Sequence, residues 1–219
     1  MFSAFSRGLS QLADGATRAI VWRCIAAALA MFAALWVAVG AALTNINLFA
    51  IPWLDAAVDV LGGLATAMIT WFLFPALISA VVGFFLEDIA ATVEARHYPA
   101  LPPADGLAAT AAAATALGYL GVMVALNVAA LLFLLVPPVF PFVFYAVNGY
   151  LLSREYFELV ALRRVGPDRV RALRRAHRGE LFAAGVVMTV LLTVPVVNLL
   201  VPVVATAAMV HLFEDWRRG

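Results

Sequence analysis

The sequence predicts an all-α integral membrane protein with two long transmembrane helices, partly penetrating (re-entrant) helical hairpins and both termini in the cytoplasm. Hydrophobic residues make up 65% of the 219 residues and charged residues only 12%, which lies outside the range of an ordinary soluble domain. Four charge-free stretches dominate the chain: Cys24 to Leu43, Val60 to Leu86, Gly106 to Ser153 and Leu181 to Val210. All fourteen basic residues are arginines, and they fall in clusters that can share one side of the membrane. The positive-inside bias places that side in the cytoplasm.

The first segment, residues 1–20, is expected to form a short amphipathic helix that lies in the membrane interface. Its apolar residues recur at helical spacing, at Phe2, Phe5, Leu9 and Leu12. The alternative is a frayed terminus. The stretch from Cys24 to Leu43 is longer than the apolar region of a signal peptide, so we expect it to be a retained span.

Residues 24–86 are expected to form an ordinary transmembrane hairpin. About 20 helical residues, at 1.5 Å per residue, cross about 30 Å of hydrocarbon, and both apolar stretches reach that length. The intervening turn, Thr44 to Asp59, contains no basic residue, as a loop on the outer side should. The second helix is expected to continue into the cytoplasm through Glu94 and to end before Pro99.

The two remaining hairpins have arms too short for two full crossings. In residues 107–153, Leu107 to Val136 could cross with a tilt, but Phe142 to Ser153 offers only twelve residues for the return. In residues 181–213, the arms are Leu181 to Val194 and Val203 to Phe213, and fourteen helical residues extend roughly 21 Å. A re-entrant hairpin that enters and leaves by the cytoplasmic face fits these lengths and the flanking arginines.

The tips of these hairpins are candidate functional positions, because non-helical backbone at membrane depth must be buried in protein or line a wet cavity. We expect Pro141 and Pro202 to start the returning arms, with helix N-termini that attract anions pointing toward the membrane interior. For the asparagines, a hydrogen bond that satisfies the local backbone is the alternative to lining a path. The candidate pore or hairpin-tip residues are Asn127, Pro141, Pro195, Asn198 and Pro202.

The segment 154–178 carries the largest arginine cluster. Pro167 and Asp168 indicate the start of a helix on which Val170 and Leu173 share an apolar face. A basic amphipathic helix beside a membrane typically binds anionic lipid headgroups, although it could also draw anions toward an entrance. The chain has no room for a folded nucleic-acid reading module, so we expect no nucleic-acid partner.

Five segments are similar to the CysZ and etoposide-induced membrane protein superfamily. They are Glu94 to Pro99, Ala146 to Leu159, His177 to Phe182, Val194 to Pro202 and Val204 to Met209. The resemblance implies a multi-pass protein of the bacterial inner (cytoplasmic) membrane that takes up sulfate for cysteine biosynthesis. It also implies two long helices, hemi-penetrating hairpins and a homo-oligomeric assembly.

The resemblance further implies a sulfate site just before the first span, where the family has a Gly-Leu-Arg-Arg motif. Here the corresponding residues are Gly15-Ala16-Thr17-Arg18, preceded by Asp14, whose charge would repel an anion. Glycine frees the backbone, threonine offers a hydroxyl, and arginine a planar fork that suits tetrahedral oxyanions. The candidate substrate-binding residues are Gly15, Thr17, Arg18 and Arg23. A positive-inside anchor is the alternative role of Arg18.

Signals for an enzyme are absent from the sequence, which has no phosphate-cradling glycine loop, nucleophile elbow or HExxH motif. The histidines His97, His177 and His211 lie far apart without ligand spacing, and Cys24 is the single cysteine, so we expect neither a metal nor a cofactor. The sequence therefore predicts a non-enzymatic anion transporter or channel for sulfate or a similar oxyanion. The alternative is a non-transporting membrane scaffold or lipid-shaping protein.

Overall fold

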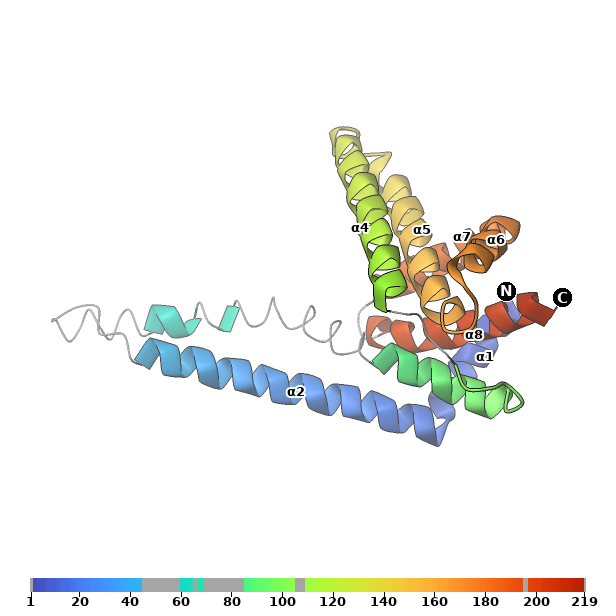
Figure 1. The fold of residues 1–219 in the computed structure, drawn as a ribbon. Coiled ribbons are helices and arrows are strands. Elements are labelled where there is room, and N and C mark those ends of the chain that lie inside the picture. Colours follow the sequence, from blue (N-terminus) through green and yellow to red (C-terminus); the bar gives the residue numbers. More distant parts are fainter. Residues whose placement is uncertain are drawn as a thin grey trace. The chain divides into compact units, whose positions relative to one another are not determined.

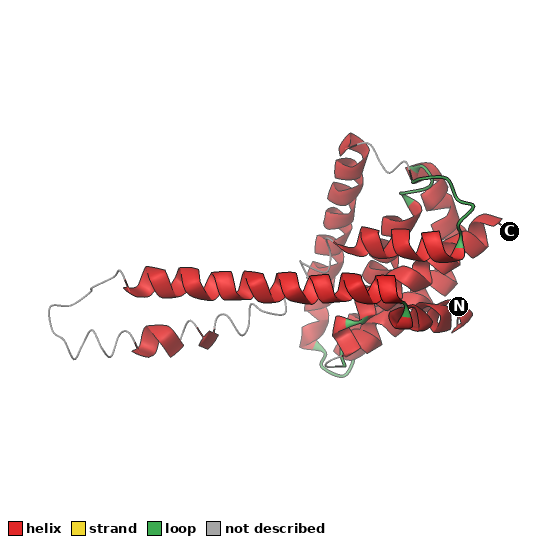
Figure 2. Cartoon of the chain, turned by 90° about the horizontal axis from the view of Figure 1, so that it is seen from below, coloured by secondary structure: helices red, strands yellow, loops and turns green. Residues whose placement is uncertain are grey.

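The computed structural model describes residues 2–44, 60–64, 67–68, 85–104, 109–194 and 197–218. Across these residues helices are the only regular secondary structure, which confirms the all-α prediction for this part of the chain (Figure 2). The chain divides into two compact units, one made of Met1–Thr17 and Leu86–Gly219 and the other of Arg18–Phe85.

The second unit consists, in its described part, mainly of the long helix α2, Gly15–Thr44, whose first three residues belong to the first unit. Its stretch Gly15–Ala38 is long and apolar enough to cross a membrane, in agreement with the predicted first span. The predicted second span and the outer loop lie largely outside the described residues. No membrane-spanning helix is therefore assigned to that part.

In the first unit, α4 and α5 lie side by side as the predicted second hairpin (Figure 1). The helix α4 covers Ala109–Leu132, the 3₁₀ turn η2 covers Phe133–Leu135, and α5 covers Phe140–Ala161. Pro141 lies in the first turn of α5, which confirms the predicted start of the returning arm. The stretch Ala114–Leu135 is the second candidate span among the described helices, and none of its residues is buried.

The chain continues through α6, Pro167–Ala176, and α7, Arg178–Leu192, before the 3₁₀ turn η3, Val197–Leu199, and α8, Val201–Arg218. The starts of α6 and α8 agree with those expected from their prolines. The two arms of the last predicted hairpin do not pair chiefly with each other. Instead α7 packs along α5, whereas α8 packs along α1 and α5.

The N-terminal helix α1, Phe2–Ser10, contradicts the alternative of a frayed terminus, because it packs closely on α8. A Cβ added at Gly8 would lie 2.8 Å from the carbonyl oxygen of Val204. The buried positions of this segment include Ala4, Gly8 and Gln11, whereas Leu9 on the predicted apolar face stays 62% exposed. The small residues Ala4 and Gly8 thus make the contact, whereas Phe5 and Leu12 are half-buried and Leu9 is exposed.

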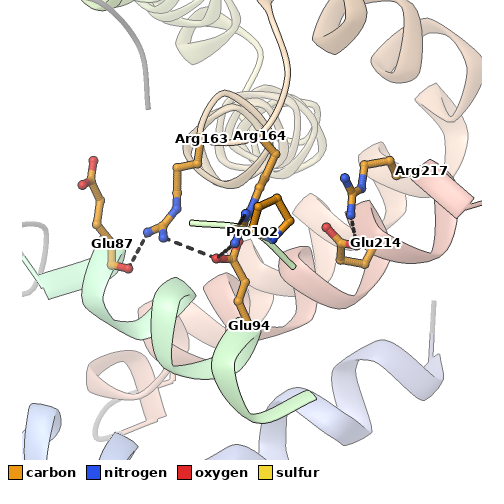
Figure 3. Close-up of polar contacts among 7 residues, drawn as sticks. All are labelled: Glu87, Glu94, Pro102, Arg163, Arg164, Glu214 and Arg217. Carbon is orange, nitrogen blue, oxygen red and sulfur yellow. Dashed lines mark hydrogen bonds and ion pairs between the residues drawn. The ribbon is translucent and has the colours of Figure 1, made fainter. Parts of the chain in front are cut away.

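An ion-pair cluster holds the helix at residues 85–97 in place. This helix ends before Pro99, as predicted. Figure 3 shows Arg163 and Arg164, from the turn after α5, converging on the carboxylate of Glu94. Arg164 also donates to the carbonyl oxygen of Pro102. Because the Glu94 side chain is only 5% exposed, this is a buried ion-pair cluster. It fastens the helix at residues 85–97 and the following loop to the end of α5.

Candidate functional site

The predicted sulfate site lies at the start of α2, where Asp14 caps the helix. The Asp14 carboxylate accepts hydrogen bonds from the backbone N–H of Thr17 at 3.2 Å and from its hydroxyl at 3.4 Å. Arg96 forms an ion pair with the same carboxylate. The negative charge of Asp14, which was expected to repel an anion, is therefore compensated by the guanidinium of Arg96, whose position could not be predicted from the sequence.

The four predicted substrate-binding residues are not brought to one point. Thr17 is fully buried, and its hydroxyl also accepts a hydrogen bond from Gln11 at 3.2 Å. Gly15 has open space around the position of a Cβ, and both Arg18 and Arg23 are exposed. At about 100° per residue, Arg18 and Arg23 project about 140° apart around α2. Gly15 and Arg18, three residues apart, share one face.

Next to Thr17, a polar cluster joins residues that sequence reasoning kept apart. The Oε1 atom of Gln11 lies 3.0 Å from Nε2 of His97, and the hydroxyl of Tyr98 lies 2.9 Å from Nδ1 of His211. The rings of His97 and His211 meet edge to face, with 4.9 Å between their centroids. These two histidines are far apart in the sequence, and only the fold brings them together. The available signal was a glutamine, Gln11, which lies buried in the 3₁₀ turn η1, Gln11–Ala13, after α1.

The environment of this cluster favours uncharged side chains. Burial lowers the pKa of His97 below 6.5, and the positive charges of Arg96 and Arg7 add to the effect. Burial, together with the charge of Asp215, raises the pKa of Tyr98 above 10.0. Both groups are therefore neutral near pH 7 and act as hydrogen-bonding groups. Within the described residues no set of three metal-ligating side chains comes together.

The predicted tip residues differ in their surroundings. Asn127 lies within α4, and its side-chain amide donates a hydrogen bond to the carbonyl oxygen of Met123 at 2.8 Å. The amide is therefore engaged by the backbone of its own helix. Asn198 lies exposed in η3, and Pro202 lies in the first turn of α8. Pro195 lies outside the described residues.

The strongest concentration of positive charge in the first unit lines a cavity between α5, α6 and α7, which we call the arginine cavity. Its volume is about 740 Å³. Its polar and charged lining residues are Tyr150, Ser153, Arg154, Arg171, Arg174, Arg175 and Arg178. The α6 face opposite these arginines packs inward through Val170 and Leu173, both buried, which confirms the predicted apolar face.

Acidic neighbours compensate only part of this charge. The Oε1 atom of Glu158 lies 2.9 Å from Nε of Arg154 and 2.5 Å from a terminal nitrogen of Arg174. Asp168 pairs with Arg171. Arg175 and Arg178 form no ion pair with any residue that the structure describes.

A comparison with known protein families gives a match over most of the chain. The family described as "Sulfate transporter CysZ/Etoposide-induced protein 2.4" matches residues 4–202, which is most of the chain. No protein with a curated function matches the sequence.

Proposed function

We propose that this chain, which belongs to the sulfate transporter CysZ/etoposide-induced protein 2.4 family, carries sulfate or a similar oxyanion across the bacterial inner membrane. The family is one of membrane transporters rather than enzymes. The observation that carries the proposal is this family match over residues 4–202. Uptake for cysteine biosynthesis, with both termini in the cytoplasm, is part of the same proposal.

The exposed apolar helices support a membrane location. In the window Ala114–Leu135 no residue is buried, and in Gly15–Ala38 only 17% of the window is. Apolar surface of this extent requires lipid or a second copy of the chain to cover it. We accordingly propose a homo-oligomer in the membrane.

Helix lengths favour the re-entrant arrangement of the α4–α5 hairpin. The hydroxyl of Tyr119 donates to Glu155 at 3.0 Å, which sets the level at which α4 passes the charged part of α5. From Tyr119 to the end of η2 at Leu135, α-helical and 3₁₀ rises give about 26 Å, less than the roughly 30 Å of hydrocarbon. The helix α7, with 15 residues, extends about 22 Å. The length of α7 supports a last hairpin that stops within the bilayer. For the α4–α5 hairpin the support depends on the level of Tyr119, because the longer stretch Ala114–Leu135 is long and apolar enough to cross.

For the first contact with the anion we propose Arg18, with the backbone at Gly15 on the same face. The pairing of Asp14 with Arg96 supports this choice, because it removes an uncompensated negative charge from the start of α2. Arg23 contributes further along the helix as part of a basic entry path. Thr17 acts through the capping hydrogen bonds that fix this helix start.

A second candidate function, a lipid-shaping scaffold, is favoured by one observation. Leu9 on α1 is 62% exposed, as an apolar side chain would be in a helix that lies in the interface. The arginines of α6 would then hold anionic lipid headgroups.

Flux of radiolabelled sulfate into vesicles that contain only this protein separates the two functions. We expect uptake above that of empty vesicles, and about a tenfold lower rate for Arg18→Gln, because one charge-assisted contact is lost. Arg169→Gln, which removes the same charge from an exposed position of α6, should keep the normal rate. A scaffold would give no uptake above empty vesicles, and an anchoring role for Arg18 would leave the rate of its variant unchanged.

A further inference from the structure

The arginine cavity contains two arginines that have no acidic partner among the described residues. Five arginines from three helices line it, and no acidic residue does. The single carboxylate of Glu158 is shared by two of these arginines and Asp168 pairs with a third, so Arg175 and Arg178 have no acidic partner among the described residues and the five arginines keep an excess of three positive charges. Like charges gathered in a concave site repel one another, so a bound multivalent anion would stabilise the arrangement.

We propose that the arginine cavity is a second oxyanion site, which binds a tetrahedral dianion: inorganic sulfate or the phosphate monoester of a lipid headgroup. Arg175 and Arg178 supply the two compensating charges. This site is separate from the proposed contact at Arg18 and does not require that the protein transports its ligand.

The other lining arginines are held in place to complete the site. Glu158 engages Nε of Arg154 and one terminal nitrogen of Arg174, and a guanidinium has five N–H donors. Most of the remaining donors of both arginines are left for a ligand in the cavity that they line. Arg174 also lies 3.4 Å from the hydroxyl of Tyr150. Glu158 is therefore a positioning residue rather than a ligand.

The shape of the site favours a compact oxyanion. The arginines converge on one concavity of about 740 Å³ from α5, α6 and α7, whereas a polyanion would need them spread along a stripe. Guanidinium groups bind the oxygens of sulfate and phosphate in a bidentate manner, which a spherical monovalent anion such as chloride does not allow. We therefore expect the site to prefer divalent oxyanions.

Equilibrium dialysis with radiolabelled inorganic sulfate tests the site directly. The full chain is purified in an uncharged detergent and carries Arg18→Gln throughout, so that the proposed N-terminal contact does not contribute. We expect Arg175→Gln and Arg178→Gln each to weaken sulfate binding about tenfold or more. Arg169→Gln is the matched control, because Arg169 is exposed on the same helix α6 but does not line the cavity. Its effect should stay within about twofold.

A parallel arm distinguishes the two sources of the ligand. Short-chain phosphatidate carries a phosphate monoester, and phosphatidylcholine of the same chain length does not. Binding of phosphatidate that weakens in the two cavity variants, in the absence of measurable sulfate binding, identifies a lipid headgroup as the ligand. Displacement of bound sulfate by phosphatidate shows that both use the same site.

The proposal is overturned if neither probe binds, or if the cavity variants and Arg169→Gln lose affinity equally for both probes. These outcomes are independent of vesicle flux, since they are measured at equilibrium without a membrane. Absence of sulfate transport would therefore not contradict the proposed site in the arginine cavity. Absence of binding in that cavity would likewise not contradict sulfate transport.

Discussion

At the scale of single residues, two glycines decide how closely α5 and α7 approach. A Cβ added at Gly185 would lie 1.8 Å from the carbonyl oxygen of Gly149, and one at Gly149 would lie 3.0 Å from the backbone nitrogen of Val186. Because these neighbouring atoms belong to the backbone, an added Cβ could be accommodated only if α5 or α7 moved. Small residues allow the same close approach between helices in membranes generally.

We expect Gly185→Ala to destabilise the protein by about 1–3 kcal/mol, because overpacking forces α5 and α7 apart. Gly179→Ala is the control on the same helix, where an added Cβ meets nothing within 4 Å. Denaturant unfolding in detergent micelles measures both variants. Equal stability of the two would mean that the glycine contact is not required.

The arginine cavity is lined from both sides of this contact, by Tyr150 and Arg154 on α5 and by Arg178 and Gly179 on α7. The sequence predicted the basic residues and the helix that carries several of them. The opposing wall could not be predicted, because it depends on which helix packs against α7. An adjacent hairpin partner, α8, was the natural expectation, and the glycine pair selects α5 instead.

At the scale of elements, the buried ion-pair cluster at Glu94 holds the helix at residues 85–97 against the end of α5. Arg164 lies 2.5 Å from the Glu94 carboxylate with its own side chain only 7% exposed, and Arg163 lies at 3.4 Å. The sequence indicated where this helix ends, since Pro99 follows it. It did not indicate the partners of Glu94, which are some seventy positions away.

Glu94→Ala should destabilise the protein by about 3–5 kcal/mol, because it leaves two guanidinium groups buried without a counter-charge. Glu87→Ala is the matched control on the same helix. The carboxylate of Glu87 is exposed, and Arg163 bonds to its backbone carbonyl oxygen at 2.6 Å, which alanine retains. Denaturant unfolding in micelles compares the two. A loss of similar size in both variants would contradict a specific role for the cluster.

At the scale of the whole molecule, the proposed topology depends on how far each hairpin penetrates. Among the described helices, only Gly15–Ala38 and Ala114–Leu135 are long and apolar enough to cross. Neither α7 nor α8 is long and apolar enough to cross, which agrees with the short arms expected from the sequence. The turn between them contains Asn198 and should therefore remain within the bilayer or on its inner side.

A single reporter cysteine tests this topology. In a chain with Cys24→Ser, we expect Asn198→Cys to resist a membrane-impermeant thiol reagent added from the periplasmic side. Asp55→Cys, in the predicted outer loop, serves as the positive control for labelling from that side. Labelling of Asn198→Cys from the periplasm would show that the last hairpin crosses completely.

Local properties of the chain determined its class, the helix starts and stops marked by prolines, and the clustering of its arginines, because hydrophobicity, proline placement and charge are properties of single residues and short segments. Tertiary structure alone decided the pairing of α1 with α8 and of α5 with α7, the meeting of His97 with His211, and the compensation of Asp14 by Arg96. Within a membrane, lipid is as apolar as the helices themselves, so burial of apolar surface does not determine which helices pack together. Close backbone contact and charge pairing select them, and both join residues that are distant in the sequence.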